Sequence, residues 1–272
     1  MFDITASIVL YKTNNDFFKT IDCFLSSPLN VHLFLIDNSP TNATEKELAK
    51  YKNNPAVEYI FNNANVGFGS GHNIAIRKAM GKSKYHVAIN PDVYFDATVI
   101  EKLFQYAESD EKIGQLLPKI LYPEGNIQYV AKLLPSPIDL LLRRFTPQFL
   151  YKKRQYTFEL QMSSYTCPFE APYLSGCFMF LRMEALEKVG LFDEQFFMYP
   201  EDIDLTRRMH RHYKTICYPL VTVYHEHGKG SYKSLKMLWI HSINMIKYFN
   251  KWGWIFDSER RQINEKILKQ FG

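Results

Sequence analysis

The alternation of β-forming and helix-forming segments in the first third of the chain constrains its fold more than any other feature. The predicted strands cover 4–11, 31–39, 57–62 and 85–93, and the predicted helices between them cover 15–27, 41–54 and 71–82. Because each helix returns the chain to the same end of the sheet, strands connected in this way pair in parallel. The sequence therefore predicts an α/β fold, with a mostly parallel central sheet flanked by helices.

Polar side chains gather directly after three of these strands. They are Asp37 and Asn38, the glycine-rich stretch 65–73, and Asn90 with Asp92. The carboxyl ends of parallel strands lie at one edge of a sheet, and ligands bind in the crevice outside that edge. We therefore expect a ligand site that draws on all three clusters.

The glycine-rich stretch NVGFGSGHN (65–73) has two interpretations. Glycines between a strand and a helix let backbone N–H groups approach a phosphate. A tight strand-to-helix turn also needs glycine for its dihedral angles, without any ligand. His72 stands where the dinucleotide-binding fingerprint has its last glycine, and the Walker lysine pattern is missing, so neither motif is met.

Asp92 and two late histidines are candidate metal ligands. A carboxylate directly after a buried strand suits a hard divalent cation shared with a diphosphate, although Asn-Pro-Asp also forms an Asx turn. His225 and His227 end a further predicted strand, 215–227. An imidazole beside a carboxylate favours manganese-like ions over calcium, and a structural role for the histidines is the alternative.

The stretch FFMYPEDIDLTRRM (196–209) places Glu201 and Asp202 behind a run of apolar residues and ahead of Arg207. Helix electrostatics explains the order of the charges, because acids favour the first turn of a helix and arginines favour later turns. A carboxylate crowded by aromatic side chains is also a candidate base, because poor solvation raises its pKa. From the residues alone, both interpretations stay open.

Composition excludes several other classes of protein. A chain of 272 residues with 46% hydrophobic and 22% charged residues is an ordinary globular protein, and a net charge of +5 is too weak to indicate nucleic-acid binding. The four cysteines form no C-x-x-C pair, which favours free thiols in a reducing compartment over zinc or disulfides. The chain shows neither a basic leader nor an apolar run of membrane-spanning length, so we expect a cytoplasmic protein.

Two segments depart from the alternation. Residues 132–165 mix prolines, aromatics and basic clusters, and are predicted to form a long loop or lid. Residues 229–272 hold nine Lys or Arg against three Asp or Glu, and include an amphipathic helix. We therefore predict a domain over 1–231 and a C-terminal helical extension over 232–272.

The apolar stripe of that extension also has two interpretations. It either packs on the core, or it attaches the protein to an anionic membrane, for which Trp252, Trp254 and Phe256 are suitable interfacial side chains. Loss of the segment after residue 232 would weaken binding to anionic vesicles only in the second case.

Seven segments occur in a characteristic order: IVLY, IDNS, NVGFGSGHN, NPDV, LSGCFMFLR, FDEQFFMYPEDIDLTRRM and HEHGKGS. In this order they resemble the inverting glycosyltransferases of family 2, which have the GT-A (nucleotide-diphospho-sugar transferase) fold. The resemblance covers roughly residues 4 to 232 and is closest to the bacterial rhamnosyltransferase-like branch, which builds O-antigen and capsule repeats. It implies a nucleotide-diphosphate sugar as donor, with dTDP-rhamnose as the first choice and a UDP- or GDP-sugar next.

The resemblance also implies roles for the strand-end residues. The donor nucleotide would lie against Tyr11, Asp37, Asn38, Asn65, Gly67, Gly69, Asn73, Asn90 and Asp92. Asp92 matches the last acid of the family's D-x-D metal motif, whereas Asn90 replaces the first acid. His225 matches the family's late histidine, because H-x-x-G-x-x-S then runs from His225 to Ser231. Asp92 and His225 would together hold Mg²⁺ or Mn²⁺.

On the acceptor side, Asp202 matches the family's general base and Glu201 would support it. Ser175, Gly176, Tyr199 and Arg207 would line the sugar and acceptor pocket. The implied acceptor is a glycan or a polyprenyl-diphosphate-linked saccharide, met at the anionic inner-membrane surface, and homo-oligomerisation stays open.

Two other functions are compatible with part of this pattern. A nucleotidyltransferase would share the nucleotide-binding core, but it needs an N-terminal glycine-rich loop with a basic residue, which VLYKTNNDFF does not provide. An inactive sugar-binding module is the other alternative, and the presence of Asp92, Asp202 and His225 argues against it.

Overall fold

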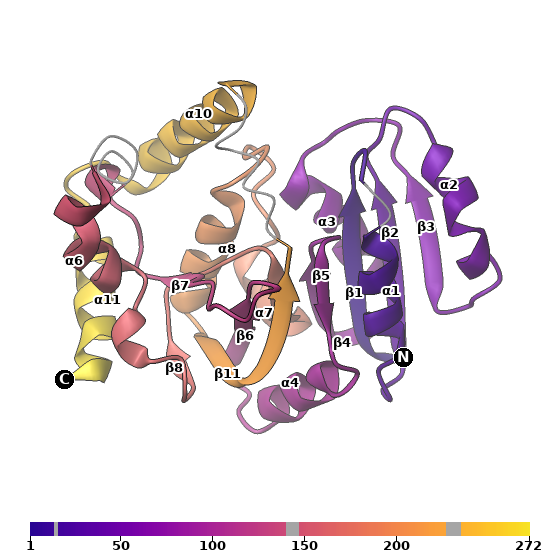
Figure 1. Cartoon of the computed structure of the whole chain (residues 1–272), viewed down its shortest axis with the longest axis horizontal. Coiled ribbons are helices and arrows are strands. Elements are labelled where there is room, and N and C mark those ends of the chain that lie inside the picture. The colour runs from indigo at the N-terminus through magenta and orange to yellow at the C-terminus, as the bar shows by residue number, and fades with distance from the viewer. Residues whose placement is uncertain (14–15, 140–146, 227–234) are drawn as a thin grey trace.

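A mixed sheet forms the centre of the protein, in a computed structural model that describes residues 1–13, 16–139, 147–226 and 235–272 (Figure 1). The strand order is β3-β2-β1-β4-β10-β6-β11-β5, and β8 pairs with β11. The strands of this sheet are β1 (Phe2–Leu10), β2 (Val31–Asp37), β3 (Val57–Phe61), β4 (Ser83–Ile89), β5 (Val93–Phe95), β6 (Ile113–Leu121), β8 (Phe169–Glu170), β10 (Phe178–Arg182) and β11 (Lys214–His225). A separate ribbon pairs β7 (Ala131–Lys132) with β9 (Tyr173–Leu174).

Helices cover both faces of the sheet and one end of the molecule. The α-helices are α1 (Phe17–Leu25), α2 (Ala43–Glu47), α3 (Phe68–Ala79), α4 (Thr98–Glu108), α6 (Gln148–Phe158), α7 (Met183–Val189), α8 (Glu201–His210), α10 (Leu235–Trp252) and α11 (Ser258–Leu268). Short 3-10 helices cover Leu48–Tyr51, Gln161–Ser163 and Lys269–Phe271. In Figure 1, α6, α10 and α11 lie at the end of the molecule opposite to α2 and β3.

Parallel pairing holds for the first four strands in spatial order, as the β–α alternation predicts. β3, β2, β1 and β4 are mutually parallel neighbours. Beyond β4 the sheet is mixed, because β10 is antiparallel to both β4 and β6, and β5 is antiparallel to β11. The segment that forms β10 enters the sheet from a distant part of the chain, so no β–α–β connection sets its direction.

Strand alternation creates two apolar layers. On β2, Leu33 and Leu35 belong to the core that faces α1 and α4, whereas Phe34 and Ile36 belong to the core that faces α3 and α7. Side chains with a period of two point to opposite faces, so a sheet covered on both faces needs apolar residues at every position. The near-continuous apolar run in this strand is the sequence signal of that burial.

Several element boundaries differ from the sequence predictions. α3 begins at Phe68 instead of residue 71, so much of the predicted glycine loop is helical. The predicted helix 41–54 divides into α2 and a 3-10 helix. The predicted loop 132–165 contains α6, and its residues 140–146 lie outside the described residues.

The C-terminal extension packs on the rest of the molecule. Met245, Tyr248 and Phe249 of α10 form a third apolar cluster with Leu134 and Phe196, among others. The structure therefore supports the core-packing interpretation for this part of the apolar stripe. No helix among the described residues is long and apolar enough to cross a membrane.

Candidate active site

The carboxyl ends of β1, β2 and β4 meet at one edge of the sheet, where the predicted donor residues begin. The β1–β2 register places Leu10 beside Asp37. Asp37 is buried, and its carboxylate accepts hydrogen bonds from the Tyr59 hydroxyl at 2.8 Å and the Ser39 N–H at 2.9 Å. Tyr11 follows β1 directly and is 45% exposed. An immobilised carboxylate thus lies near an accessible aromatic ring.

Gly67 is required because two loops approach each other closely. Its φ of +92° lies in the left-handed region, and a Cβ there would be 2.3 Å from the carbonyl oxygen of Phe197. The Asn38 side chain donates to the Gly67 carbonyl at 3.1 Å, and the Asn65 side chain accepts from the Gly67 N–H at 3.2 Å. These contacts support the tight-turn interpretation of this glycine and place Asn38 and Asn65 as its anchors.

Gly69 and Asn73 lie within α3 and contact the segment that precedes α8. A Cβ on Gly69 would be 2.9 Å from Cβ of Phe192. The Asn73 amide donates to the Phe192 carbonyl and to the Glu194 carboxylate, both at 2.9 Å, and accepts from the Phe192 N–H at 3.1 Å. Asn73 was predicted to contact the donor. Instead, these bonds commit its amide to positioning the chain before α8.

Asp92 and His225 come together from separate strand ends. Oδ1 of Asp92 lies 3.4 Å from Nε2 of His225, and this buried oxygen has no hydrogen-bond partner among the described residues. Gln128 holds the imidazole from the other side, with its Oε1 3.1 Å from Nδ1 and its Nε2 donating to the His225 carbonyl at 2.7 Å. Asn90 is also adjacent, with its Nδ2 3.4 Å from Nε2.

This pair fits a divalent cation, although two protein ligands would not complete a site. No group of three or more His, Cys, Asp or Glu placed to hold a metal occurs among the described residues. A buried, unpaired carboxylate oxygen facing an imidazole nitrogen is nevertheless a donor pair that Mg²⁺ or Mn²⁺ accepts, with the other positions left for diphosphate oxygens. Burial works to lower the pKa of His225, but the adjacent Asp92 carboxylate and Cys177 thiol outweigh this and raise that pKa to about 10, so a cation would have to displace the proton from Nε2. His227, Gly228 and Ser231 of the predicted motif lie outside the described residues.

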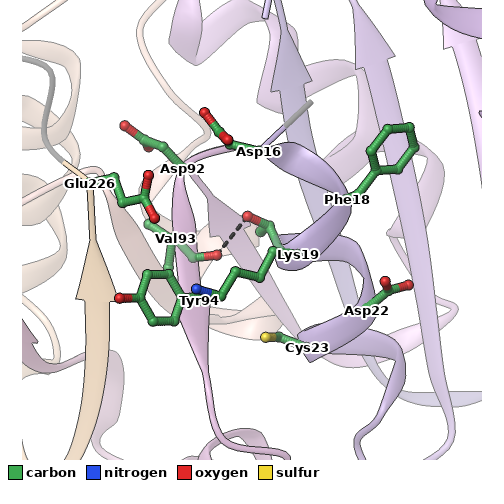
Figure 2. Close-up of a pocket in the computed structure, with 10 residues that line it drawn as sticks. Asp16, Phe18, Lys19, Asp22, Cys23, Asp92, Val93, Tyr94 and Glu226 are labelled. Carbon is green, nitrogen blue, oxygen red and sulfur yellow. Dashed lines mark hydrogen bonds between the residues drawn. The ribbon is translucent and has the colours of Figure 1, made fainter. Parts of the chain in front are cut away.

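A cavity of about 430 Å³ opens beside Asp92, between α1 and β5. Figure 2 shows the carboxylates of Asp16, Asp92 and Glu226 near one another along its upper side. Lower in the cavity, the ammonium of Lys19 lies 3.0 Å from the centre of the Tyr94 ring, a cation–π contact. The neighbouring carboxylates strengthen the negative potential around Asp92.

Asp202 lies in the first turn of α8 and faces the short connection between β9 and β10. Its Oδ2 accepts from the Gly176 N–H and its Oδ1 from the Ile203 N–H, both at 2.8 Å. A Cβ on Gly176 would be 3.3 Å from Cβ of Asp202, so glycine permits this close approach. The carboxylate is therefore fixed in one orientation by two backbone donors.

Burial changes the protonation of both acids at the start of α8. Glu201 is 3% exposed and its Oε2 has no partner among the described residues. Burial raises the pKa of Glu201, and the neighbouring charge of Asp202 raises it further. Burial also raises the pKa of Asp202, but hydrogen bonds from Gly176 and Ile203 and the charge of Lys132 act in the opposite direction. Of the two acids, Asp202 thus has the surroundings that stabilise the ionised carboxylate more strongly.

Ser175 and Tyr199 lie on the segments that flank Asp202. The Ser175 N–H donates to the Val130 carbonyl at 3.1 Å, and its hydroxyl accepts from the Cys177 N–H at 3.4 Å. Tyr199 has a φ of +93°, an uncommon backbone conformation for a residue with a side chain. Its ring meets His241 edge-on at 4.8 Å. The positive φ is a form of backbone strain that occurs often at functional sites.

The expectation that Arg207 would meet the acceptor is wrong. Its guanidinium is 1% exposed and makes two 2.8 Å hydrogen bonds to Asp257 and further bonds to Glu259, with the ring of Trp252 at 4.2 Å. These three partners belong to the C-terminal extension. Arg207 therefore anchors α10 and α11 to α8.

Two residues of the site were missed from the sequence. Gln128 orients His225 from a position 97 residues earlier in the chain, and Lys132 acts electrostatically on Asp202 from β7. Neither lies in a recognisable motif, and both belong to a stretch without clear periodicity. No signal in a single sequence would have identified them.

Solved structures show that the fold is GT-A. The chain aligns with a structure of GalNAc-T7 with UDP, GalNAc and Mn²⁺ at a TM-score of 0.62 and 16% identity, over 82% of this chain and 43% of that chain. It aligns with S. aureus TarS residues 1–349 at a TM-score of 0.60 and 12% identity, over 98% of this chain and 70% of that chain. The predicted fold class is confirmed.

Within that class, the chain belongs to glycosyl transferase family 2, whose family model matches residues 8–190. An N-acetylglucosaminyl-diphospho-decaprenol L-rhamnosyltransferase of Mycobacterium tuberculosis is 29% identical over 201 residues, or 68% of this chain. A low-salt glycan biosynthesis hexosyltransferase (Agl10) of Haloferax volcanii is 23% identical over 211 residues, or 77% of this chain. The alignments span 62% of the length of each relative. The predicted family is confirmed.

Proposed function

We propose that this protein transfers a sugar from a nucleotide-diphosphate donor to a hydroxyl of a saccharide acceptor, with inversion at the anomeric carbon. One observation carries the proposal. Asp202 is a buried carboxylate held in place by two backbone N–H groups at the start of α8. A base must be fixed relative to the reacting hydroxyl, and this geometry supplies that restraint.

The reaction then needs one displacement. The Asp202 carboxylate takes the proton of the acceptor hydroxyl, whose oxygen forms a bond to the anomeric carbon. The bond between that carbon and the phosphate oxygen breaks, and the nucleoside diphosphate leaves with the electron pair. Attack from the face opposite to the leaving group inverts the configuration. General-base assistance of this kind is worth about 10² to 10⁴ in rate.

The donor would lie along the strand-end edge that leads from Tyr11 and Asp37 to Asp92. Asp92 and His225 would hold Mg²⁺ or Mn²⁺ at the diphosphate. Such a cation stabilises the negative charge of the leaving group when it is bound. The unpaired Oδ1 of Asp92 facing Nε2 of His225 supports this assignment.

For the donor sugar we propose L-rhamnose from dTDP-rhamnose, with another dTDP-, UDP- or GDP-sugar as the alternative. The rhamnosyltransferase of M. tuberculosis supports rhamnose and, through its N-acetylglucosaminyl-diphospho-decaprenol substrate, a lipid-linked saccharide as the acceptor class. The hexosyltransferase of H. volcanii supports a role in glycan biosynthesis. We propose O-antigen, capsule or another cell-surface polysaccharide as the product. Four free cysteines are consistent with a reducing, cytoplasmic compartment.

A donor panel tests the proposal. The purified protein is incubated with dTDP-rhamnose and with UDP- and GDP-sugars, with and without Mg²⁺ or Mn²⁺, in the presence of a diphosphate-linked N-acetylglucosamine acceptor. We expect nucleoside diphosphate release with one donor class, and NMR of the product should show an inverted anomeric configuration. A retained configuration would contradict the mechanism, and failure to turn over any donor of the panel would contradict the function.

A further inference from the structure

Six large apolar side chains are exposed at the end of the molecule formed by α6 and the turn between α10 and α11. This set, called here the apolar surface, consists of Ile138 (56% exposed), Phe149 (77%), Leu150 (67%), Trp254 (43%), Ile255 (73%) and Phe256 (93%). Soluble monomers rarely expose a contiguous apolar patch of this kind without a partner. Isolated exposed residues need no explanation, so contiguity decides whether the surface has a function.

Hydrogen bonds tie the three segments of the apolar surface together. Arg260 donates to the carbonyl of Pro135 at 3.5 Å and to that of Trp254 at 3.1 Å, which joins the loop before Ile138 to the α10–α11 turn. Arg154 donates to the Asp139 carboxylate at 2.6 Å, which joins the same loop to α6. In Figure 1, α6 and α11 lie at the same end of the molecule. The apolar surface is therefore assembled from segments more than 100 residues apart.

Basic side chains accompany the apolar ones. α6 carries Lys152, Lys153 and Arg154 and no acid. Lys152 and Lys153 are exposed and form no salt bridge among the described residues, and Arg261 in the first turn of α11 is exposed as well. Exposed aromatics and leucine beside unpaired lysines match the chemistry of a bilayer interface with anionic headgroups.

The apolar surface is also connected to the proposed base. Lys132 acts electrostatically on Asp202, and Pro135, at the edge of this surface, follows Lys132 by only three positions in the chain. A chain of three residues spans at most about 11 Å. An acceptor whose lipid part lay in a membrane at this end would therefore present its saccharide on the side of Asp202.

We propose that the apolar surface docks on an anionic lipid bilayer and thereby receives a lipid-linked acceptor from the membrane. The inference rests on the proposed function for the acceptor, but the docking itself does not require turnover. Trp252, one of the residues predicted for the membrane, does not take part, because its indole N–H donates to Asp204 at 2.8 Å and its ring packs on Arg207. Trp254 and Phe256 do take part.

Charge favours a bilayer over a second copy of this chain as the occupant. A twofold contact places the same patch of both copies face to face, so Lys152 and Lys153 would meet their own equivalents. A bilayer containing anionic lipids instead supplies the opposite charge, worth about 1 kcal/mol for each lysine near its surface, or roughly 30-fold in binding for two. Dimerisation through the apolar surface is thus an outcome that the test must detect.

Vesicle flotation with matched variants tests the proposal. Leu150→Glu should weaken binding to vesicles of phosphatidylcholine and phosphatidylglycerol by about tenfold or more, because a buried leucine side chain is worth at least about 1.5 kcal/mol. Leu220→Glu is the control, since Leu220 is similarly exposed (60%) but lies on β11. Lys152→Gln/Lys153→Gln should weaken binding about 30-fold. Lys46→Gln/Lys52→Gln should leave binding unchanged, because Lys46 belongs to α2, at the opposite end of the molecule, and Lys52 follows the next 3-10 helix.

Three results would overturn the proposal. The first is no binding of the wild type to anionic vesicles, and the second is equal weakening by the test and control variants. The third is a wild-type dimer that Leu150→Glu dissociates, measured by sedimentation, without binding to vesicles. Nucleoside diphosphate release with a water-soluble acceptor, measured on the same variants, separates the two proposals. If vesicle binding is lost but nucleoside diphosphate release is intact, the proposed function is still supported. If the protein binds vesicles but releases no nucleoside diphosphate, only the proposed docking surface is supported.

Discussion

Replacing Asp202 by asparagine removes the proposed base while changing little else. The substitution keeps the size of the side chain and one oxygen, but an amide cannot accept the proton of the acceptor hydroxyl. General-base catalysis contributes about 10² to 10⁴ in rate, so kcat should fall by at least about a hundredfold, equivalent to about 2.7 kcal/mol or more.

The effect on stability should be much smaller than the effect on turnover. Both carboxylate oxygens accept backbone N–H groups, and the asparagine amide would satisfy only one of them. Leaving a buried donor without its partner costs about 1 to 3 kcal/mol. Burial raises the pKa of Asp202, so removing a poorly solvated charge acts in the opposite direction. We expect a folded variant that binds donor normally.

Steady-state kinetics with saturating donor, together with donor binding by calorimetry, provides the assay. Asp96→Asn is the matched control, because it makes the same chemical change at an exposed carboxylate after β5. A variant at position 202 that keeps more than a tenth of wild-type turnover, with Asp96→Asn unchanged, would refute the assignment of the base.

The pH profile gives an independent check of the same residue. The base works when deprotonated, so kcat/KM should rise as pH increases through the pKa of Asp202. Because burial raises this pKa, the acidic limb should lie above the value of about 3.9 for a solvated aspartate. A limb at or below that value would contradict the burial of the base.

Three further predictions concern stability. Asp257→Asn keeps the N-cap of α11 but breaks the buried ion pair with Arg207. It should lower the free energy of unfolding, measured in urea, by about 3 to 5 kcal/mol, and a decrease of less than about 1 kcal/mol would contradict this prediction. Gly67→Ala should lower the same free energy of unfolding by about 3 kcal/mol or more, because the positive φ and the clash with Phe197 both destabilise the folded state. Gly81→Ala is the control: Gly81 also has a positive φ but open space around it, so the decrease should be only about 1 kcal/mol. Burial lowers the pKa of His86 to about 3, so below pH 6.5 the unfolded state binds a proton that the folded state does not. Below pH 6.5 the free energy of unfolding should therefore decrease as the pH falls, and this decrease should be steeper in the wild type than in His86→Gln by up to about 1.4 kcal/mol per pH unit. Equal slopes for the two proteins would argue against a neutral buried imidazole.

The sequence predicted much of the local structure well. Strands at the N-terminal half, the helix after the glycine-rich stretch and the helix that starts at Glu201 all depend on local propensity and hydrophobic period. The order of the motifs was sufficient to recognise the family. The positions of Asp92 and Asp202, next to a strand end and a helix start, were also readable from local signals.

Only the tertiary structure decided what several polar side chains contact. The family resemblance implied an acceptor role for Arg207, yet its partners Asp257 and Glu259 lie about 50 residues away in sequence. The amide of Asn73 is likewise committed to residues about 120 positions later. Local sequence specifies which groups need partners, but contacts between distant segments determine which partners they find.

The same distinction applies to the end of the molecule formed by α6 and α11. The amphipathic pattern of α10 did not indicate which apolar residues pack and which stay exposed. That outcome depends on how α10 docks against Leu134 and Phe196, which leaves Phe256, after the end of α10, exposed at the same end of the molecule as α6. From sequence alone this chain determines a GT-A fold, its family and two carboxylate positions. The packing of distant segments determines the anchor at Arg207, the Gln128–His225 contact and the apolar surface, because side-chain burial depends on non-local neighbours.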